Sequence, residues 1–131
     1  MSSPFLDRPA SDRVAENHLA FALRDGFPVS EGHTLLIPKR LVATWFDATR
    51  DEHLALLDLA DLVKADLDRT LAPDGYNLGV NVGPAAGQTV MHLHLHLIPR
   101  YAGDVPDPRG GVRHVIPDKA NYLLPKPEPP R

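Results

Sequence analysis

The sequence predicts an α+β fold in which short antiparallel strands form one sheet and a single long helix packs across it. Three features indicate this fold: two short apolar runs joined by turn residues, a longer segment with helical periodicity, and a segment in which apolar residues alternate with histidines. The length of 131 residues, with 43% hydrophobic and 24% charged residues, suits one globular unit. We therefore expect a single domain over residues 1–131, with its core at about 14–104 and a proline-rich extension over 105–131.

The first two strands are predicted at residues 19–23 and 33–38. Each run is short and apolar, and residues 24–28 between them contain the glycine and proline that favour a turn. The two runs are therefore expected to be neighbouring strands.

A long helix is predicted to begin at Thr49, because Thr49 and Glu52 have the spacing of a capping box. It is expected to end at residues 73–75, Pro-Asp-Gly. Apolar residues at intervals of three and four form one buried stripe: Leu56, Ala60, Val63, Leu67 and Leu71. The aspartates on the other side are expected to face solvent: Asp58, Asp61, Asp66 and Asp68.

The second half of the sheet is predicted from residues 76–82 and 88–98, with a glycine-rich loop over 83–87 between them. In the later segment, histidines alternate strictly with apolar residues. With one helix inserted, this order of strands predicts an α+β meander.

Three histidines are predicted to share one face of the last strand, because successive side chains on a strand point to opposite faces. The histidine face would carry Val90, His92, His94, His96 and Ile98. The other face, suited to burial beneath the helix, would carry Met91, Leu93, Leu95 and Leu97. Imidazole can attack phosphorus and can also bind zinc, and this spacing does not separate nucleophilic catalysis from metal binding.

The residues around the histidines favour phosphate chemistry. The loop 83–87, followed by Gln88 and Thr89, offers backbone and side-chain donors to a phosphate, for which a metal site has no use. Arg100, just after the strand, adds a cation.

The overall composition argues against several classes of protein. A formal charge of −3 gives no broad basic surface for nucleic acid, and the absence of cysteine excludes disulfides and thiolate metal sites. No apolar run approaches the roughly 20 residues that cross a membrane, and residues 1–8 lack the pattern of a secretory signal. We therefore expect a cytoplasmic protein that binds neither nucleic acid nor membrane.

The run His92-Leu93-His94-Leu95-His96-Leu97-Ile98 resembles the motif of the histidine-triad (HIT) family, in which three histidines alternate with apolar residues. The resemblance extends over about residues 19–104, including Gly32-His33 and the segment 83–90. That loop and the ending over 99–104 look most like the fragile-histidine-triad branch. The resemblance implies a five-stranded antiparallel sheet with one helix across it, and a homodimer whose sheets run together.

The resemblance also implies roles for single residues. His94 would be the nucleophile that forms a nucleotidyl-histidine intermediate, His92 would orient it, and His96 would contact the phosphate and help the leaving group depart. His33 matches the family's fourth histidine and would tune the triad. For the nucleotide, the matching positions are Leu23 at the base, Asp25 at the ribose, and Asn81, Gln88 and Thr89 at the phosphates.

The implied reaction is hydrolysis of a nucleoside 5′-phosphoryl bond, with an adenine-containing dinucleoside polyphosphate as the first candidate substrate. Nucleoside phosphoramidates and aminoacyl adenylates are the alternative substrates, and a nucleotide-binding sensor with little catalysis is the alternative function. The resemblance implies no metal site and no cofactor, although a divalent cation can accompany a polyphosphate. In the extension, Arg109 and Arg113 are hypothesised to reach phosphates.

Overall fold

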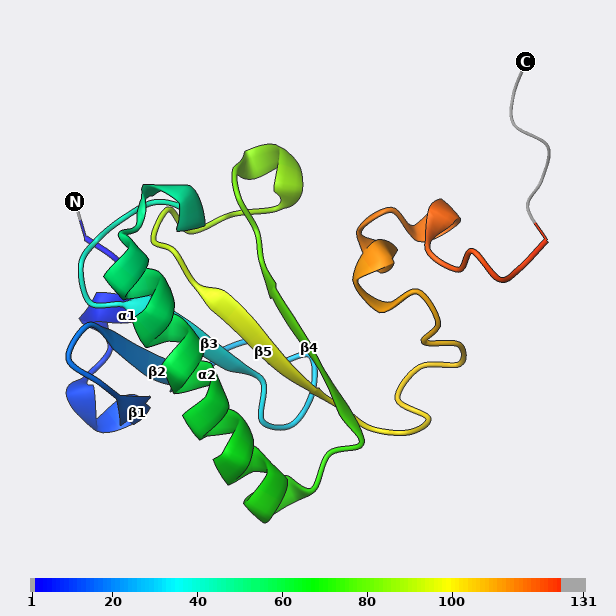
Figure 1. The fold of residues 1–131 in the computed structure, drawn as a ribbon, viewed down its shortest axis with the longest axis horizontal. Coiled ribbons are helices and arrows are strands. Elements are labelled where there is room, and N and C mark those ends of the chain that lie inside the picture. The colour runs from blue at the N-terminus through cyan, green and yellow to red at the C-terminus, as the bar shows by residue number, and fades with distance from the viewer. Residues whose placement is uncertain (1, 126–131) are drawn as a thin grey trace. The chain divides into compact units, whose positions relative to one another are not determined.

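The sheet has five antiparallel strands in the order β1-β2-β3-β5-β4, as the sequence led us to expect in number and direction. The computed structural model describes residues 2–125, and these residues divide into two compact units, 2–100 and 101–125. The first unit contains the whole sheet and its long helix (Figure 1). Its strands are β1 (Arg13–Glu16), β2 (Ala20–Arg24), β3 (Thr34–Pro38), β4 (Gly75–Val80) and β5 (Leu95–Arg100).

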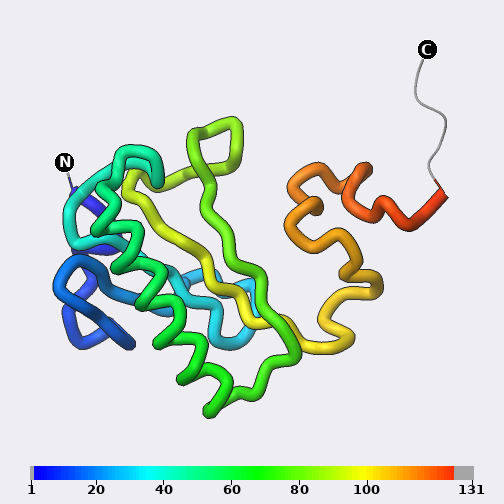
Figure 2. The backbone as a smooth tube through the Cα atoms, in the orientation of Figure 1, coloured from blue at the N-terminus to red at the C-terminus, as the bar shows by residue number. Residues whose placement is uncertain are grey.

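The strand order corrects the predicted meander. Strand β5 pairs with β3 on one side and with β4 on the other, so the last strand in the chain lies inside the sheet rather than at its edge (Figure 2). The physical reason lies in burial: Leu95 and Leu97 are 5% and 3% exposed, and an interior position removes such residues from water better than an edge does.

Helix α2 (Arg50–Leu71) begins and ends where the sequence predicts. Thr49 accepts from the Glu52 backbone N–H and the Glu52 carboxylate accepts from Thr49, which completes the capping box. Ala72 ends the helix in the left-handed conformation. The predicted stripe packs on one face of the sheet, with Leu56, Ala60, Val63 and Leu67 buried and Leu71 half-buried. The four aspartates of the opposite side are exposed.

The predicted strand over residues 88–98 is too long. Residues 88–94 form bends and irregular chain, and only residues from Leu95 onward pair in the sheet. The Leu93 N–H donates to the carbonyl of Val42, which belongs to a loop rather than a strand, so no ladder forms there. Two consequences are that Met91 is 41% exposed rather than buried, and that His92 and Leu93 are both buried although they are adjacent.

Two elements at the start of the chain were not predicted. A short helix α1 (Pro4–Asp7) is capped by Ser3, and strand β1 pairs with β2 at the edge of the sheet. Phe5 of α1 packs on the sheet face opposite α2, against the buried residues Phe21, Leu23, Leu35 and Ile37. The histidine side of the sheet therefore has an apolar cluster of its own.

The second unit contains two short 3₁₀ helices, Gly111–Val115 and Pro117–Lys119. Among the described residues, no helix is long and apolar enough to cross a membrane. Residues 126–131 of the predicted extension lie outside the described part of the chain.

Candidate functional site

The sheet register places His96 on the face opposite α2. His96 of β5 lies opposite Leu35 of β3, and Leu35 lies opposite Leu23 of β2. Residues directly opposite in an antiparallel pair point to the same face, so these three side chains form one row across the sheet. The register thus brings Leu23, predicted at the base, to the same face as the predicted triad.

The imidazole rings follow one another along this face. The ring centroids of His33 and His96 are 5.2 Å apart, and those of His96 and His94 are also 5.2 Å apart. Phe5 then stands edge-on to His94 at 5.0 Å and lies 5.9 Å from His92. The rings of His33, His96 and His94 therefore lie in a row, and the Phe5 ring lies close to both His94 and the fully buried His92.

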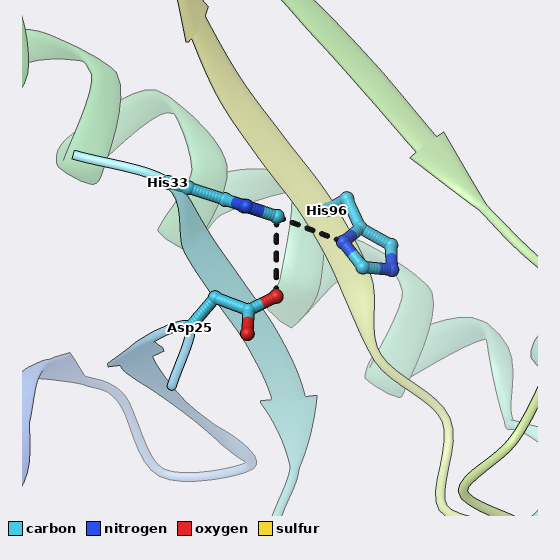
Figure 3. Close-up of side chains that lie close together, drawn as sticks. All are labelled: Asp25, His33 and His96. Atoms are coloured by element: carbon cyan, nitrogen blue, oxygen red, sulfur yellow. Dashed lines mark hydrogen bonds and ion pairs between the residues drawn. The ribbon is translucent and has the colours of Figure 1, made fainter. Parts of the chain in front are cut away.

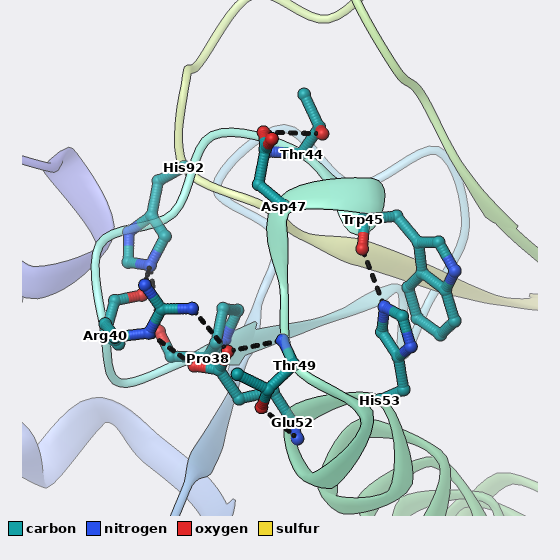
Figure 4. Close-up of polar contacts among 9 residues, drawn as sticks. All are labelled: Pro38, Arg40, Thr44, Trp45, Asp47, Thr49, Glu52, His53 and His92. Carbon is teal, nitrogen blue, oxygen red and sulfur yellow. Dashed lines mark hydrogen bonds and ion pairs between the residues drawn. The ribbon is translucent and has the colours of Figure 1, made fainter.

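His92 is held by bonds at both ring nitrogens. Its Nε2 lies 2.8 Å from the carbonyl of Pro38 and 3.2 Å from that of Arg40 (Figure 4). Carbonyls only accept, so Nε2 carries the proton and Nδ1, 2.7 Å from the hydroxyl of Ser3, is the acceptor. Burial lowers the pKa of His92. Because both nitrogens of the neutral His92 ring are hydrogen-bonded, His92 can orient His94 but cannot itself act as a nucleophile.

His94 has the opposite arrangement. Its Nδ1 lies 2.8 Å from the backbone carbonyl of His92, so Nδ1 carries the proton and donates. The lone pair of a neutral ring then lies on Nε2, which has no hydrogen-bond partner among the residues that the structure describes. A backbone carbonyl on one ring nitrogen and a bare lone pair on the other is the arrangement that nucleophilic catalysis by imidazole requires.

The His33 tautomer is set by a backbone amide. The N–H of Val29 donates to Nδ1 of His33 at 3.1 Å, so the proton of the neutral ring is on Nε2. That Nε2–H faces Nδ1 of His96 at 3.0 Å and Oδ2 of Asp25 at 3.4 Å (Figure 3). The shorter contact makes His96 Nδ1 the acceptor, which leaves the proton of neutral His96 on its own Nε2.

Burial keeps this pair of rings neutral. It is the main cause that lowers the pKa of His96 to about 4, with the neighbouring His94 and His33 adding to the effect and Asp25 opposing it. Burial also lowers the pKa of His33, again against the opposing charge of Asp25. Near neutral pH, His96 therefore presents a hydrogen-bond donor at Nε2.

The predicted alternative of a zinc site on the triad has little support in this geometry, because neither nitrogen of His92 is free. Within the described residues, one group of side chains lies close enough to share an ion: the ligand atoms of Asp25, His33 and His96 are all within 4.8 Å of one another. However, a metal on His33 Nε2 would displace its proton to Nδ1, where the Val29 N–H already donates. The tautomer of His33 therefore disfavours a metal at this position.

Of the residues predicted to hold phosphate, Gln88 is hydrogen-bonded to backbone groups. Gln88 is 4% exposed and donates to the carbonyls of Ala43 and Val90, at 2.6 and 3.0 Å, while its Oε1 accepts from the Gly83 N–H. Both amide protons are thus used within the loop, and a contact of Gln88 with phosphate needs one of these bonds to be released. Thr89 is exposed.

Asn81 is half-buried, and within the described residues no hydrogen bond or ion pair joins Asn81, Gln88 or Thr89 to a histidine ring. The arginines hypothesised to reach phosphates bond within their own unit. Arg109 pairs with Asp107 at 2.9 Å, and Arg113 donates to the carbonyls of Lys119 and Ala120. Their predicted roles remain predictions.

Sequence reasoning missed Ser3 and Phe5. Ser3 contacts His92, which lies 89 positions later in the chain, and Phe5 packs against His94. Ser3 followed by Pro4 is a recognisable helix start, since serine is a favoured N-cap and proline suits the first helical position. That signal locates a helix but not its neighbours. Their place at the site could be found only in the folded chain.

Comparison with known proteins gives one consistent result. The sequence profile of the family described as "HIT domain" matches residues 8–103. An uncharacterized HIT-like protein, MG132 of Mycoplasma genitalium, is 42% identical over 70% of this chain and 64% of its own length. The bis(5′-adenosyl)-triphosphatase of Dictyostelium discoideum is 39% identical over 74% of this chain and 64% of its own length. The AP-4-A phosphorylase of Mycobacterium tuberculosis is 32% identical over 79% and 56%.

Solved structures give the same picture. A HIT family protein from Bacillus anthracis superposes with a TM-score of 0.68 at 36% identity, over 71% of this chain and 66% of that one. A Zn-bound histidine triad family protein from Mycobacterium smegmatis superposes with a TM-score of 0.72 at 33% identity, over 82% and 85%. In the sequence comparison, by contrast, the match covers less than two thirds of the length of each of the three relatives named above.

Proposed function

Because this chain belongs to the histidine-triad (HIT) domain family, we propose that it is a hydrolase that cleaves a nucleoside 5′-phosphoryl bond through a covalent nucleotidyl-His94 intermediate. The observation that carries the proposal is the bond from His94 Nδ1–H to the carbonyl of His92, which leaves the lone pair of His94 on Nε2. The proposed substrates are dinucleoside polyphosphates, because two relatives are named for diadenosine compounds.

In the first step, His94 Nε2 attacks the α-phosphorus, the N–P bond forms, and the bond from phosphorus to the bridging oxygen of the leaving polyphosphate breaks. The substituted imidazole is then cationic, and its Nδ1–H stays bonded to the carbonyl of His92, which stabilises that charge. His96 is neutral near pH 7 and donates from Nε2 to a phosphoryl oxygen as negative charge builds up there.

In the second step, water attacks the same phosphorus and the N–P bond breaks. The electron pair of that bond returns to His94 Nε2, the water oxygen becomes part of the nucleoside monophosphate, and the water proton passes to solvent. The carbonyl of His92 again holds the ring in place, since its bond to Nδ1–H needs no change between the two steps.

The apolar cluster on the histidine face provides the proposed base pocket. Leu23 and Leu35 are buried beside Phe5, in the same cross-strand row as His96. Asp25, two residues beyond Leu23, has a half-buried carboxylate that can accept from ribose hydroxyls. A flat apolar base and a polar sugar would thus be bound side by side, next to the nucleophile.

The proposal requires neither a metal nor a cofactor in the chemical steps, and a divalent cation would enter only with the polyphosphate. We also propose that two copies pair as a homodimer. β4 is an edge strand with Leu78 45% exposed, and unpaired edges with apolar residues favour pairing. The proposed partners are therefore the nucleotide and a second copy of the chain.

The test is mass spectrometry of protein quenched with denaturant at alkaline pH, where the N–P bond persists, during turnover of diadenosine tri- and tetraphosphate. We expect one added adenylyl group on the peptide containing His94, and release of AMP. His94→Ala should lose both the adduct and the turnover, whereas His18→Ala, which removes an exposed histidine outside the family motif, should keep them.

Three further arms separate the alternatives. Added inorganic phosphate that diverts the product from AMP to ADP would indicate a phosphorylase rather than a hydrolase. Faster turnover of an adenosine phosphoramidate would name the other substrate class. Tight nucleotide binding without an adduct on His94 or any product would replace the hydrolase with a nucleotide sensor.

A further inference from the structure

The hydroxyl of Ser3 lies at the centre of a buried contact that no part of the reaction scheme above uses. Ser3 is 1% exposed, and its Oγ lies 2.7 Å from Nδ1 of the fully buried His92. The same oxygen lies 3.2 Å from the backbone N of Phe5, as the cap of α1. The preceding residue, Ser2, is also a serine but is exposed.

The direction of each bond follows from its partners. Because His92 Nε2 must donate to the carbonyls of Pro38 and Arg40, Nδ1 carries a lone pair and accepts. The Phe5 N–H can only donate, so the Ser3 oxygen accepts from it and directs its single proton to His92. Every group in this contact is thereby satisfied, in agreement with the absence of unpartnered buried side-chain atoms in the described chain.

The contact reaches the proposed nucleophile through the His92 residue. Its ring is fixed by Ser3 on one side and by two carbonyls on the other, and its backbone carbonyl lies 2.8 Å from Nδ1 of His94. A ring anchored at both nitrogens cannot rotate without losing bonds in a site closed to water. The position of the carbonyl that selects the His94 tautomer is therefore tied to Ser3.

A second contact from the same segment acts on the same ring. Phe5, two residues after Ser3, packs edge-on against His94 at 5.0 Å between ring centroids. The cap bond from Phe5 N–H to Ser3 Oγ links the two contacts. The segment 3–5 thus touches the first histidine of the triad by a hydrogen bond and the second by ring packing.

We propose that Ser3 is a positioning residue for the nucleophile, acting through His92, and that the segment 3–5 is part of the reaction site rather than a terminal extension. The inference rests on the proposed function for its effect on rate, but not for its effect on the rings. Ser3 donates to His92, His92 presents its carbonyl to His94, and His94 keeps its lone pair on Nε2.

The rate test compares Ser3→Ala with Ser2→Ala as the matched control. One net hydrogen bond changes an equilibrium by roughly 3- to 10-fold, so Ser3→Ala should slow formation of the nucleotidyl-His94 intermediate by about that factor. KM should stay near that of the wild type, because Ser3 lies behind His92 rather than in the base pocket. Ser3→Thr, which keeps the hydroxyl, should restore most of the rate.

The second test reads the rings without any substrate, by ¹⁵N NMR of the imidazoles in the full chain. The wild type should show His92 protonated at Nε2 with a hydrogen-bonded Nδ1, and His94 protonated at Nδ1. In Ser3→Ala, the Nδ1 signal of His92 should move toward that of a nitrogen without a donor, and His94 should show an increased fraction protonated at Nε2. If Ser3→Ala does not fold, Ser3→Cys carries both tests, since a thiol is a weak donor of similar shape.

The two tests separate the possible failures. Unchanged ring signals and an unchanged rate in a folded Ser3→Ala, with only a lower Tm, would overturn the inference and leave Ser3 as a helix cap. Failure of Ser3→Thr to restore the rate would also overturn it. Altered ring signals in a protein that hydrolyses no nucleotide would retain the contact and reject the proposed function.

Discussion

The backbone N–H of Val29 donates to Nδ1 of His33, and this one bond decides where the proton of His33 lies. With Nδ1 accepting, the ring donates from Nε2 to His96 Nδ1 at 3.0 Å, and His96 in turn keeps its own proton on Nε2. Position 33 was predicted to tune the triad. For that predicted role the geometry offers a fixed order of protons, from the main-chain N–H of Val29 through His33 to His96, the ring proposed to contact the phosphate.

Removing His33 is expected to lower the rate without abolishing it. In His33→Ala, Nδ1 of His96 loses its donor and the two tautomers of His96 become closer in energy, so the donor at Nε2 is no longer enforced. We expect kcat to fall roughly 10-fold, which corresponds to about 1.4 kcal/mol, with a smaller change in KM. Steady-state kinetics beside His18→Ala measures this. A kcat equal to that of the control would show that His96 holds its tautomer without His33.

The stability of the fold is expected to fall as the pH drops from about 6.5 to about 4. Burial lowers the pKa of His96 from 6.5 to about 4 and also lowers the pKa values of His33 and His92. Between those pH values the unfolded chain binds more protons than the folded chain, so the free energy of unfolding decreases on acidification. Each proton contributes at most about 1.4 kcal/mol per pH unit.

The measurement is urea unfolding followed by circular dichroism at pH values from 7 to 4.5. His96→Asn should show a shallower dependence on pH than the wild type, because one of the three rings no longer titrates. A free energy of unfolding that stays constant between pH 7 and 5 would mean that these rings are not desolvated as the structure indicates.

The salt bridge between Glu52 and Arg40 is expected to stabilise both the start of α2 and the loop that faces His92. The Glu52 carboxylate, 3% exposed, binds Arg40 at 2.7 and 3.1 Å and also accepts from the Thr49 N–H (Figure 4). Glu52→Ala should lower the free energy of unfolding by roughly 1–2 kcal/mol, mainly through loss of the cap, because the Arg40 side chain is 54% exposed.

Asp51→Asn is the control, since Asp51 is exposed in the same turn of the helix. The bond to Arg40 lowers the pKa of Glu52, so this stabilisation is present above the ordinary value of 4.5 and is lost as the pH falls below it. Thermal unfolding of both variants at pH 7 compares them. Equal Tm values for Glu52→Ala and Asp51→Asn would show that Glu52 does not stabilise the fold.

A side chain at Gly32 is expected to destabilise the fold. Its φ is +89°, and a Cβ would lie 2.9 Å from methyl groups of both Leu67 and Leu71 at the end of α2. Gly32→Ala should destabilise the fold by roughly 1–3 kcal/mol and should displace His33, the next residue. Gly26→Ala, in the same connection with open space around it, should change the Tm little. A Gly32→Ala protein as stable as Gly26→Ala would mean that the turn adapts.

The local signals in the sequence predicted the main elements well, because each depends on neighbours in the chain. The capping box at Thr49 and the stripe from Leu56 to Leu67 located α2, since helical periodicity and caps are set within a few residues. The alternation rule worked over residues 95–98 and gave the wrong result over 88–94. It holds only where a strand is paired, and pairing depends on a distant partner.

The sequence by itself determined the α+β class, the long helix, the buried leucines of β5 and the family motif that predicts a nucleophile at His94. Only the tertiary structure decided which nitrogen of each ring carries a proton. Those protons are placed by Ser3, Val29 and the carbonyls of Pro38 and Arg40, which come to the rings from other segments. Periodicity records which side chains share a face, whereas a tautomer depends on the single donor or acceptor that folding brings to each nitrogen.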